Sequence, residues 1–296
     1  MRHVVRIVDR LQSNYRELLK KKLGRRYDEA VKGYDVLGSI AVIGESGRDG
    51  KAVADAVMSV NKNIRTVVSK AGAVKGRYRK RQYVFVAGEK NYIAEYRENN
   101  CVFRFDIRKT FFSPRLSFER KRIVDLSKDK EHVVVMFAGV GPFAIEIAKK
   151  NKNSEVIAIE LNKDSFGYML ENIKLNKIKN VIAVLGDAKK AVEKKRNWAD
   201  RIMMPLPMSS DKFLESAMGC ARDGCVVHFY SFGNASDPFS DSSKNARELA
   251  GSMGFSARVV GKRVVRPYAR DISEIVLDIR ISKNKGRKRM ARNPKE

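Results

Sequence analysis

The feature that most constrains the fold is an alternation of strand-like and helix-like segments between residues 133 and 185. Three apolar runs are typical of strands, and two stretches of helical length separate them. In chain order they are a strand from Val133 to Met136, a helix from Pro142 to Lys150, a strand from Val156 to Ile159, a helix from Ser165 to Asn176 and a strand from Val181 to Leu185. This βαβαβ order predicts an α/β fold with a doubly wound, Rossmann-like sheet.

A glycine turn links the first strand of this unit to its first helix. It reads Phe137-Ala138-Gly139-Val140-Gly141, and Pro142 then suits the start of a helix. Glycines let the backbone turn tightly and approach a ligand closely, although a plain strand-to-helix connection needs the same residues. The turn does not read G-x-G-x-x-G, and no lysine follows it as in a phosphate-binding loop. A dinucleotide or a nucleoside triphosphate is therefore disfavoured as the ligand.

Carboxylates stand at the ends of the next two strands. In an open α/β sheet, ligands bind at the carboxyl ends of the strands, where the strand order reverses. Glu160 ends the second strand about 20 residues after the turn, where its carboxylate can accept both ribose hydroxyls of an adenosine. Asp187 follows the third strand and places a carboxylate where the adenine amino group would lie. With the glycine turn, these two carboxylates predict a site for an adenosyl group.

The chain divides by its texture into four parts. Residues 1–33 are predicted to form a helical lead-in, 34–108 a small α+β domain, 109–282 the doubly wound domain and 283–296 a polar, basic, disordered tail. In the small domain we expect a helix at 51–60 and strands at 36–37, 40–43, 64–68, 83–86, 92–96 and 102–107. After the βαβαβ unit we expect strands at 201–204, 225–230, 258–265 and 274–281.

The charge balance favours a polyanionic partner. The chain has 61 Lys and Arg against 34 Asp and Glu, a net charge of +27, and the basic residues run from Arg2 to Lys295. Nucleic acid fits such a spread best, and a generically basic solvated surface is the alternative. No run approaches the roughly 18 apolar residues of a membrane helix, and the start has no signal-peptide pattern, so we expect a cytoplasmic protein. The cysteines lack CxxC spacing and the histidines are scattered, so no metal site or disulfide framework is predicted.

Several motifs resemble those of one enzyme family. They are Phe112-Ser113-Pro114-Arg115-Leu116, Glu119-Arg120, Met136-Phe137-Ala138-Gly139-Val140-Gly141-Pro142-Phe143, Ala158-Ile159-Glu160-Leu161-Asn162, Glu171-Asn172-Ile173-Lys174-Leu175-Asn176 and Gly186-Asp187. Together they resemble the archaeal and eukaryotic tRNA (guanine-37-N1)-methyltransferases, from about Asp35 to Ser282. The resemblance implies a methyltransferase domain behind a smaller tRNA-binding domain, S-adenosylmethionine as the cofactor, and tRNA as the partner, modified at position 37 of its anticodon loop.

The resemblance also implies which residues carry out the transfer. Guanine N1 is protonated at neutral pH, so methylation needs a base for that proton and a cation to stabilise charge on O6. The family's base is the glutamate just after the Ser-Pro-Arg motif, which falls on Glu119. Its O6-supporting arginine falls in the segment from Lys75 to Arg81 and points to Arg79, with Arg77 and Arg81 as alternatives. Read without the resemblance, Glu119 is an ordinary surface ion-pair partner and the arginine run is an RNA-backbone contact.

The remaining contacts that the resemblance implies form two sets. The residues implied for the cofactor are Arg120, Phe137, Ala138, Gly139, Val140, Gly141, Glu160, Leu161, Asp187 and Ala188. Those implied for RNA are Arg77, Arg79, Arg81 and Arg115. No residue is assigned to a metal, and a monomer is expected.

Two positions depart from the family pattern. Val135 replaces an acidic residue before the Met-Phe-Ala-Gly segment, which removes one polar contact near the methionine end of the cofactor. Pro205, which we place in the catalytic set, replaces an asparagine whose amide can both donate to and accept from the base. The proline leaves only a carbonyl and an apolar ring. With proline at this position, the chain resembles an archaeal subgroup that also methylates the tricyclic 4-demethylwyosine at C7, giving isowyosine. The alternative interpretation of Pro205 is a neutral change at a rigid strand end.

Two other functions compete with this one. The related aminocarboxypropyl transferase of the wybutosine pathway uses the same cofactor and a similar sheet, but it moves the larger arm of the cofactor. It lacks a paired-proline segment, so Pro205-Leu206-Pro207 argues against it. A non-catalytic RNA-binding protein on a decayed methyltransferase fold is the third possibility.

Overall fold

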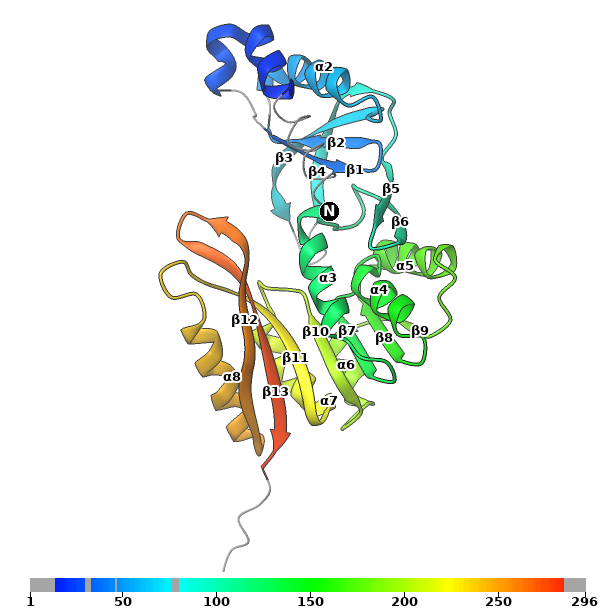
Figure 1. The fold of residues 1–296 in the computed structure, drawn as a ribbon, viewed down its shortest axis with the longest axis vertical. Coiled ribbons are helices and arrows are strands. Elements are labelled where there is room, and N and C mark those ends of the chain that lie inside the picture. The colour runs from blue at the N-terminus through cyan, green and yellow to red at the C-terminus, as the bar shows by residue number, and fades with distance from the viewer. Residues whose placement is uncertain (1–13, 30–32, 46, 76–79, 285–296) are drawn as a thin grey trace, which may run out of the picture. The chain divides into compact units, whose positions relative to one another are not determined.

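The structure is a computed structural model that describes residues 14–29, 33–45, 47–75 and 80–284 (Figure 1). Within these ranges the chain forms two compact units. The first comprises residues up to 127 together with 138–152 and 160–186, and the second comprises 128–137, 153–159 and the residues from 187 onward. None of the helices in the described ranges is long and apolar enough to cross a membrane.

The first unit begins with a four-stranded sheet of order β1-β2-β3-β4. Its strands are β1 (Tyr34–Leu37), β2 (Ile40–Ile43), β3 (Thr66–Lys75) and β4 (Lys80–Gly88). Helix α2 (Gly50–Val60) connects β2 to β3, which pair in parallel, and it buries Val53, Ala54, Ala56 and Val57. Residues 14–23 are helical and bury Tyr15, Leu19 and Leu23 in the same apolar cluster as α2. The predicted lead-in therefore shares the core of the small domain.

A hairpin of β5 (Ile93–Glu98) and β6 (Cys101–Asp106) follows the small sheet. Its turn residues Asn99 and Asn100 both have positive φ, as a two-residue hairpin turn requires. The outer side of β6 is paired by side chains instead of a third strand: the Oδ1 atoms of Asn172 and Asn176 on helix α5 (Lys163–Leu175 and its C-cap) accept from the N–H of Arg104 and Val102 at 2.7 and 2.9 Å. These amides satisfy an edge that would otherwise attract another strand.

The large sheet has seven strands in the order β12-β13-β11-β10-β7-β8-β9. They are β7 (His132–Met136), β8 (Glu155–Glu160), β9 (Val181–Leu185), β10 (Ala199–Met204), β11 (Ala221–Asn234), β12 (Phe255–Ala269) and β13 (Ile272–Lys283). The pairs β7–β8, β7–β10 and β10–β11 are parallel, and β13 is antiparallel to β11 and β12. The strand order reverses between β7 and β10. The predicted doubly wound sheet is confirmed.

Helix α4 (Pro142–Lys150) lies at the residues that the sequence predicted. Four further helices in the described ranges were not predicted from the sequence pattern. They are α3 (Ser117–Leu126), α6 (Ala188–Glu193), α7 (Asp211–Cys220) and α8 (Ser240–Ser252), and α8 lies along β12 (Figure 1). Helix α8 buries only small residues, Ser242, Ala246 and Ala250, so its sequence carries a weak apolar stripe. Strand β13 includes Lys283, whose N–H donates to Asp223 Oδ1 at 2.9 Å, so the predicted tail begins later than expected. Residues 285–296 lie outside the described ranges.

Candidate active site

The glycine turn after β7 is fixed by left-handed backbone conformations. Phe137, Gly139 and Gly141 have φ of 57°, 59° and 90°. A Cβ on Gly141 would lie 3.0 Å from side-chain atoms of both Ile145 and Met169, so this position needs glycine for space as well as for its φ. Gly141 is the N-cap of α4, and Pro142 occupies the first turn of that helix. At the end of β7 the turn therefore presents backbone atoms of Gly139 and Gly141 without side chains over them.

Glu160 ends β8 and contacts this turn directly. Its Oε2 accepts from the Gly139 N–H at 2.7 Å, and its Oε1 accepts from the Asn162 N–H at 2.7 Å. Burial raises the pKa of the Glu160 carboxyl, while hydrogen bonds from backbone N–H groups act in the opposite direction. Each ionised carboxylate oxygen has a second lone pair for another donor. The side chain is thus held in place and can still accept ribose hydroxyls, so the residues present fit an adenosyl group. Leu161 follows, partly buried.

Replacing Glu160 with glutamine is expected to weaken S-adenosylmethionine binding about 10- to 100-fold, the range for losing hydrogen bonds to a charged acceptor. The amide keeps the shape of the side chain but replaces one acceptor oxygen with a donor that faces the hydroxyls. Isothermal titration calorimetry measures the change in Kd. Glu155→Gln, at the opposite end of β8, is the matched control and should leave Kd unchanged. Equal Kd values for the Glu160 variant and the wild type would contradict the assignment.

In the second unit, Asp187 is the N-cap of α6. Its Oδ1 accepts from the Lys189 N–H at 2.9 Å, and the next residue, Ala188, is buried. The ring of Phe137 meets Phe213 edge to face, with centroids 4.7 Å apart, and the Lys189 ammonium lies 5.4 Å from the centre of the Phe213 ring. Asp187 thus has a structural role as a cap, and its predicted contact with adenine stays a prediction.

Glu119 lies in the first turn of α3, with only 3% of its surface exposed. Its two carboxylate oxygens accept from Arg122 Nη2 at 2.7 Å and Nε at 2.9 Å, in a bidentate pair. The sequence interpretation as an ion-pair partner is correct, but its surface location is wrong. The i,i+3 spacing on a helix was the signal that could have identified Arg122. This pair fixes the orientation of the carboxylate proposed as the base.

Arg120, the next residue on α3, points into the protein interior. Its guanidinium is 2% exposed, donates to Glu98 Oε2 at 2.7 Å and to the Ser113 carbonyl at 3.1 Å, and also lies 3.7 Å from Glu146 Oε1. Burial, followed by the charge of Glu98, raises the pKa of Glu146 to about 9. The Glu146 carboxyl therefore favours its neutral form beside the buried Arg120–Glu98 pair. The predicted contact of Arg120 with the cofactor stays a prediction.

The predicted RNA-binding arginines are only partly described. Arg77 and Arg79 lie outside the described residues. Arg81, on β4, donates to the Gly72 carbonyl at 3.2 Å. Arg115 donates to both carboxylate oxygens of Asp35, at 2.8 and 3.3 Å, and so connects the Ser-Pro-Arg segment to β1. Sequence reasoning did not identify Asp35 as its partner.

The loop after β10 carries Pro205. The Leu206 N–H donates to the Met204 carbonyl at 2.8 Å, and the buried Ser210 hydroxyl donates to the carbonyls of Met204 and Leu206 at 3.2 and 2.8 Å. These bonds hold the loop in one shape around the proline. Val135, the other departure from the family pattern, is completely buried in the middle of β7.

Known proteins are similar to this chain in sequence and in architecture. The TRM5/TYW2 methyltransferase domain matches residues 94–257, and the TYW2 N-terminal domain matches residues 15–91. The tRNA (guanine(37)-N(1))-methyltransferase Trm5b of Pyrococcus abyssi is 39% identical over 93% of this chain and 82% of its own. The tRNA (guanine(37)-N(1))/4-demethylwyosine(37)-methyltransferase Taw22 of Nanoarchaeum equitans is 27% identical over 79% of this chain and 96% of its own.

Solved structures agree with these matches. A complex of aTrm5 with tRNALeu superposes with a TM-score of 0.79 at 30% identity, covering 91% of this chain and 78% of that one. P. horikoshii TYW2 in complex with MeSAdo superposes with a TM-score of 0.75 at 25% identity, covering 92% and 99%. The fold, the glycine turn with Glu160 and the two matched domains lead to one conclusion. The chain belongs to the TRM5/TYW2 family of S-adenosylmethionine-dependent enzymes.

Proposed function

We propose that this protein transfers a methyl group from S-adenosylmethionine to N1 of guanine-37 in the anticodon loop of tRNA. The observation that carries the proposal is the buried Glu119 carboxylate, oriented by Arg122 directly after the Ser-Pro-Arg segment. A carboxylate in a fixed orientation suits removal of the N1 proton. Relatives with this activity and a related complex with tRNA support the same substrate.

The chain's own residues have distinct roles in this reaction. The turn from Phe137 to Gly141 and Glu160 hold the cofactor, with Arg120, Leu161, Asp187 and Ala188 proposed as further contacts. When bound, S-adenosylmethionine supplies an electrophilic methyl group on a sulfonium centre. Glu119 accepts the N1 proton as the nitrogen becomes nucleophilic, and an arginine from the segment 77–81, with Arg79 preferred, stabilises the negative charge on O6.

Mass spectrometry of nucleosides tests the proposal. A tRNA transcript with guanine-37 is incubated with protein and cofactor, digested, and compared with an otherwise identical transcript carrying adenine-37. We expect 1-methylguanosine from the first transcript and no product from the second. Absence of the methylated nucleoside from the guanine-37 transcript would overturn the proposed function.

A second substrate is favoured by Pro205. A tricyclic base presents a larger flat face, and the rigid loop around Pro205 offers it an apolar wall with no side-chain donor to satisfy. The bifunctional activity of the Taw22 relative points to the same base. We propose that the protein also methylates 4-demethylwyosine at C7.

Pro205→Asn is expected to shift the ratio of guanine-37 activity to 4-demethylwyosine activity at least about 10-fold toward guanine, as the amide regains a hydrogen-bonding pair for that base. The measurement compares kcat/KM on tRNA carrying each base. Met208→Asn places the same side chain three residues away at an exposed position and should leave the ratio unchanged. An unchanged ratio in the Pro205 variant would show that the proline does not determine specificity.

The two domain matches also allow the aminocarboxypropyl transfer reaction, because the small domain and a solved TYW2 structure are similar to this chain. The same spectra separate the two reactions, since a methyl and an aminocarboxypropyl group add different masses. A non-catalytic RNA-binding protein would yield neither product. The segment Pro205-Leu206-Pro207, which the aminocarboxypropyl transferase lacks, favours methylation.

A further inference from the structure

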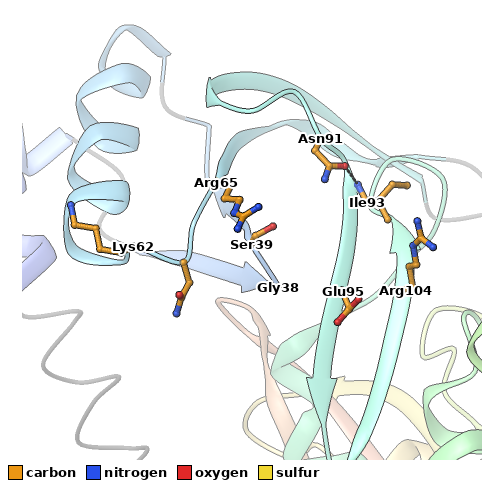
Figure 2. A pocket seen from close by; sticks show the side chains of 9 residues that line it. Gly38, Ser39, Lys62, Arg65, Asn91, Ile93, Glu95 and Arg104 are labelled. Atoms are coloured by element: carbon orange, nitrogen blue, oxygen red, sulfur yellow. Dashed lines mark hydrogen bonds between the residues drawn. The ribbon is translucent and has the colours of Figure 1, made fainter. Parts of the chain in front are cut away.

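A polar hollow lies between the small sheet and the β5–β6 hairpin, within the first unit. Its volume is about 580 Å³, and Figure 2 shows the side chains that line it. Ser39 and Arg65 stand on the small-sheet side, and Asn91, Glu95 and Arg104 stand on the hairpin side. The hollow is separate from the glycine turn and from α3, so the proposed methyl transfer leaves it without a role.

Positive charge dominates the lining. Its described lining residues include the cations Lys62, Arg65 and Arg104 and one carboxylate, Glu95. That carboxylate already pairs with Arg97 at 2.7 Å. Arg104 contacts Glu171 at 3.0 Å, in an exposed pair of little energetic value. Lys62 and Arg65 are exposed and make no ion pair with any residue in the described ranges. Two cations are therefore available to an incoming anion without breaking an existing contact.

The wall that carries Arg65 is rigid. The Arg65 N–H donates to the Ser39 carbonyl at 2.9 Å, and its carbonyl accepts from the Glu89 N–H at 2.8 Å. Two glycines allow the chains to approach this closely: a Cβ on Gly38 would lie 2.4 Å from the Glu95 carbonyl oxygen, and one on Gly88 would lie 2.0 Å from the Arg65 carbonyl oxygen. The backbone under the arginine is thus preorganised, which lowers the entropy cost of binding.

The donors and the shape select the chemical class of ligand. The Asn91 Oδ1 accepts from the Ile93 N–H at 2.9 Å, which leaves the amide nitrogen to donate into the hollow (Figure 2). None of the described residues that line the hollow is aromatic, so they offer a nucleobase no ring to stack on. Cations with amide and hydroxyl donors in an open polar hollow match the phosphates and sugars of an RNA backbone.

We propose that this hollow binds backbone phosphates of the tRNA, with Lys62 and Arg65 as the principal contacts. The proposal rests on the proposed function for the identity of the RNA. The hollow adds affinity and orients the tRNA without reading its sequence, since phosphate contacts carry no base information.

The test measures the Kd for a tRNA transcript between 50 and 200 mM salt, using full-length wild-type protein and the double variant Lys62→Glu, Arg65→Glu. Two lost phosphate contacts lower the slope of log Kd against log salt by about 2, so the ratio of Kd at 200 mM to Kd at 50 mM falls about 10-fold. Lys51→Glu, exposed on α2 of the same domain, is the control for a change of charge and should alter the slope less. S-adenosylmethionine binding and thermal unfolding should match the wild type.

An unchanged slope of log Kd against log salt in the double variant would overturn the proposal. An equal decrease of this slope in the Lys51 variant would overturn it as well. Methylation by the wild type is measured on the same transcript, which keeps the two hypotheses apart. If the wild type methylates guanine-37 while the slope is unchanged, the proposed function stands and the hollow is not an RNA site. If the slope falls in the double variant but the wild type does not methylate guanine-37, the hollow binds RNA and the proposed reaction is wrong.

Discussion

Glu119→Gln should lower the rate of N1 methylation about 10²- to 10⁴-fold, the usual contribution of general-base catalysis. Glutamine fills the same buried volume and can still accept from Arg122, so α3 keeps its structure. It has no acceptor basic enough to take the N1 proton. Single-turnover measurements with saturating tRNA and labelled cofactor report the chemical step, and calorimetry should show unchanged binding of S-adenosylmethionine.

A matched control is available on the same helix. Asp125→Asn also converts a carboxylate to an amide on α3, but Asp125 is exposed and pairs with Lys121 on the protein surface. Its rate should equal that of the wild type. If the Glu119 variant methylates guanine within about three-fold of the wild-type rate, well below the contribution expected of a base, then Glu119 does not remove the proton.

Sequence patterns predicted the strands, the helix and the turn whose structure depends on residues close together in the chain. The three strands of the βαβαβ unit contain continuous apolar runs, although the edge strand β9 is partly exposed, and α4 begins with proline. Both β9 and α4 occur at the predicted residues. The turn needs glycine at positive φ. Glu160 ends the next strand, 21 residues after Gly139, and contacts the turn as its sequence position predicts. These features depend on neighbours in the sequence, so one sequence reveals them.

Pairings between distant residues escaped prediction because no spacing encodes them. In the second unit, Arg201 contacts Glu131 at 2.7 Å and His228 at 2.7 Å, and His228 contacts Asp278 at 2.6 Å. This buried chain of polar groups crosses β10, β11 and β13. Its members appear in the sequence as isolated polar residues in strands or next to them, and only the order of strands in the sheet makes them neighbours. The buried cluster of Glu98, Arg120 and Glu146 has the same origin.

That cluster leads to the largest expected effect on stability. Arg120→Met should destabilise the protein by about 3–5 kcal/mol, because it removes one partner of the buried Arg120–Glu98 ion pair. Lys121→Met, the next residue on α3, removes only an exposed pair and should change little. Chemical denaturation gives both values. The double variant Glu98→Gln, Arg120→Met should recover part of the loss, because the uncompensated charge is gone. If the Arg120 variant is as stable as the wild type, the positive charge of Arg120 does not stabilise the cluster.

The Glu146 carboxyl should make the stability of the protein depend on pH. The pKa of Glu146 is raised from 4.5 to about 9 in the folded protein, so between these values the folded state binds a proton that the unfolded state has lost. The stabilisation from this proton is complete below pH 4.5 and is lost as the pH rises toward 9. Glu146→Gln imitates the protonated carboxyl, so at pH 7 it should be at least as stable as the wild type, and its stability should fall less between pH 5 and pH 9. Parallel pH profiles for the two proteins would mean that Glu146 is already ionised beside Glu98, in which case Arg120 balances two charges and its removal should cost more.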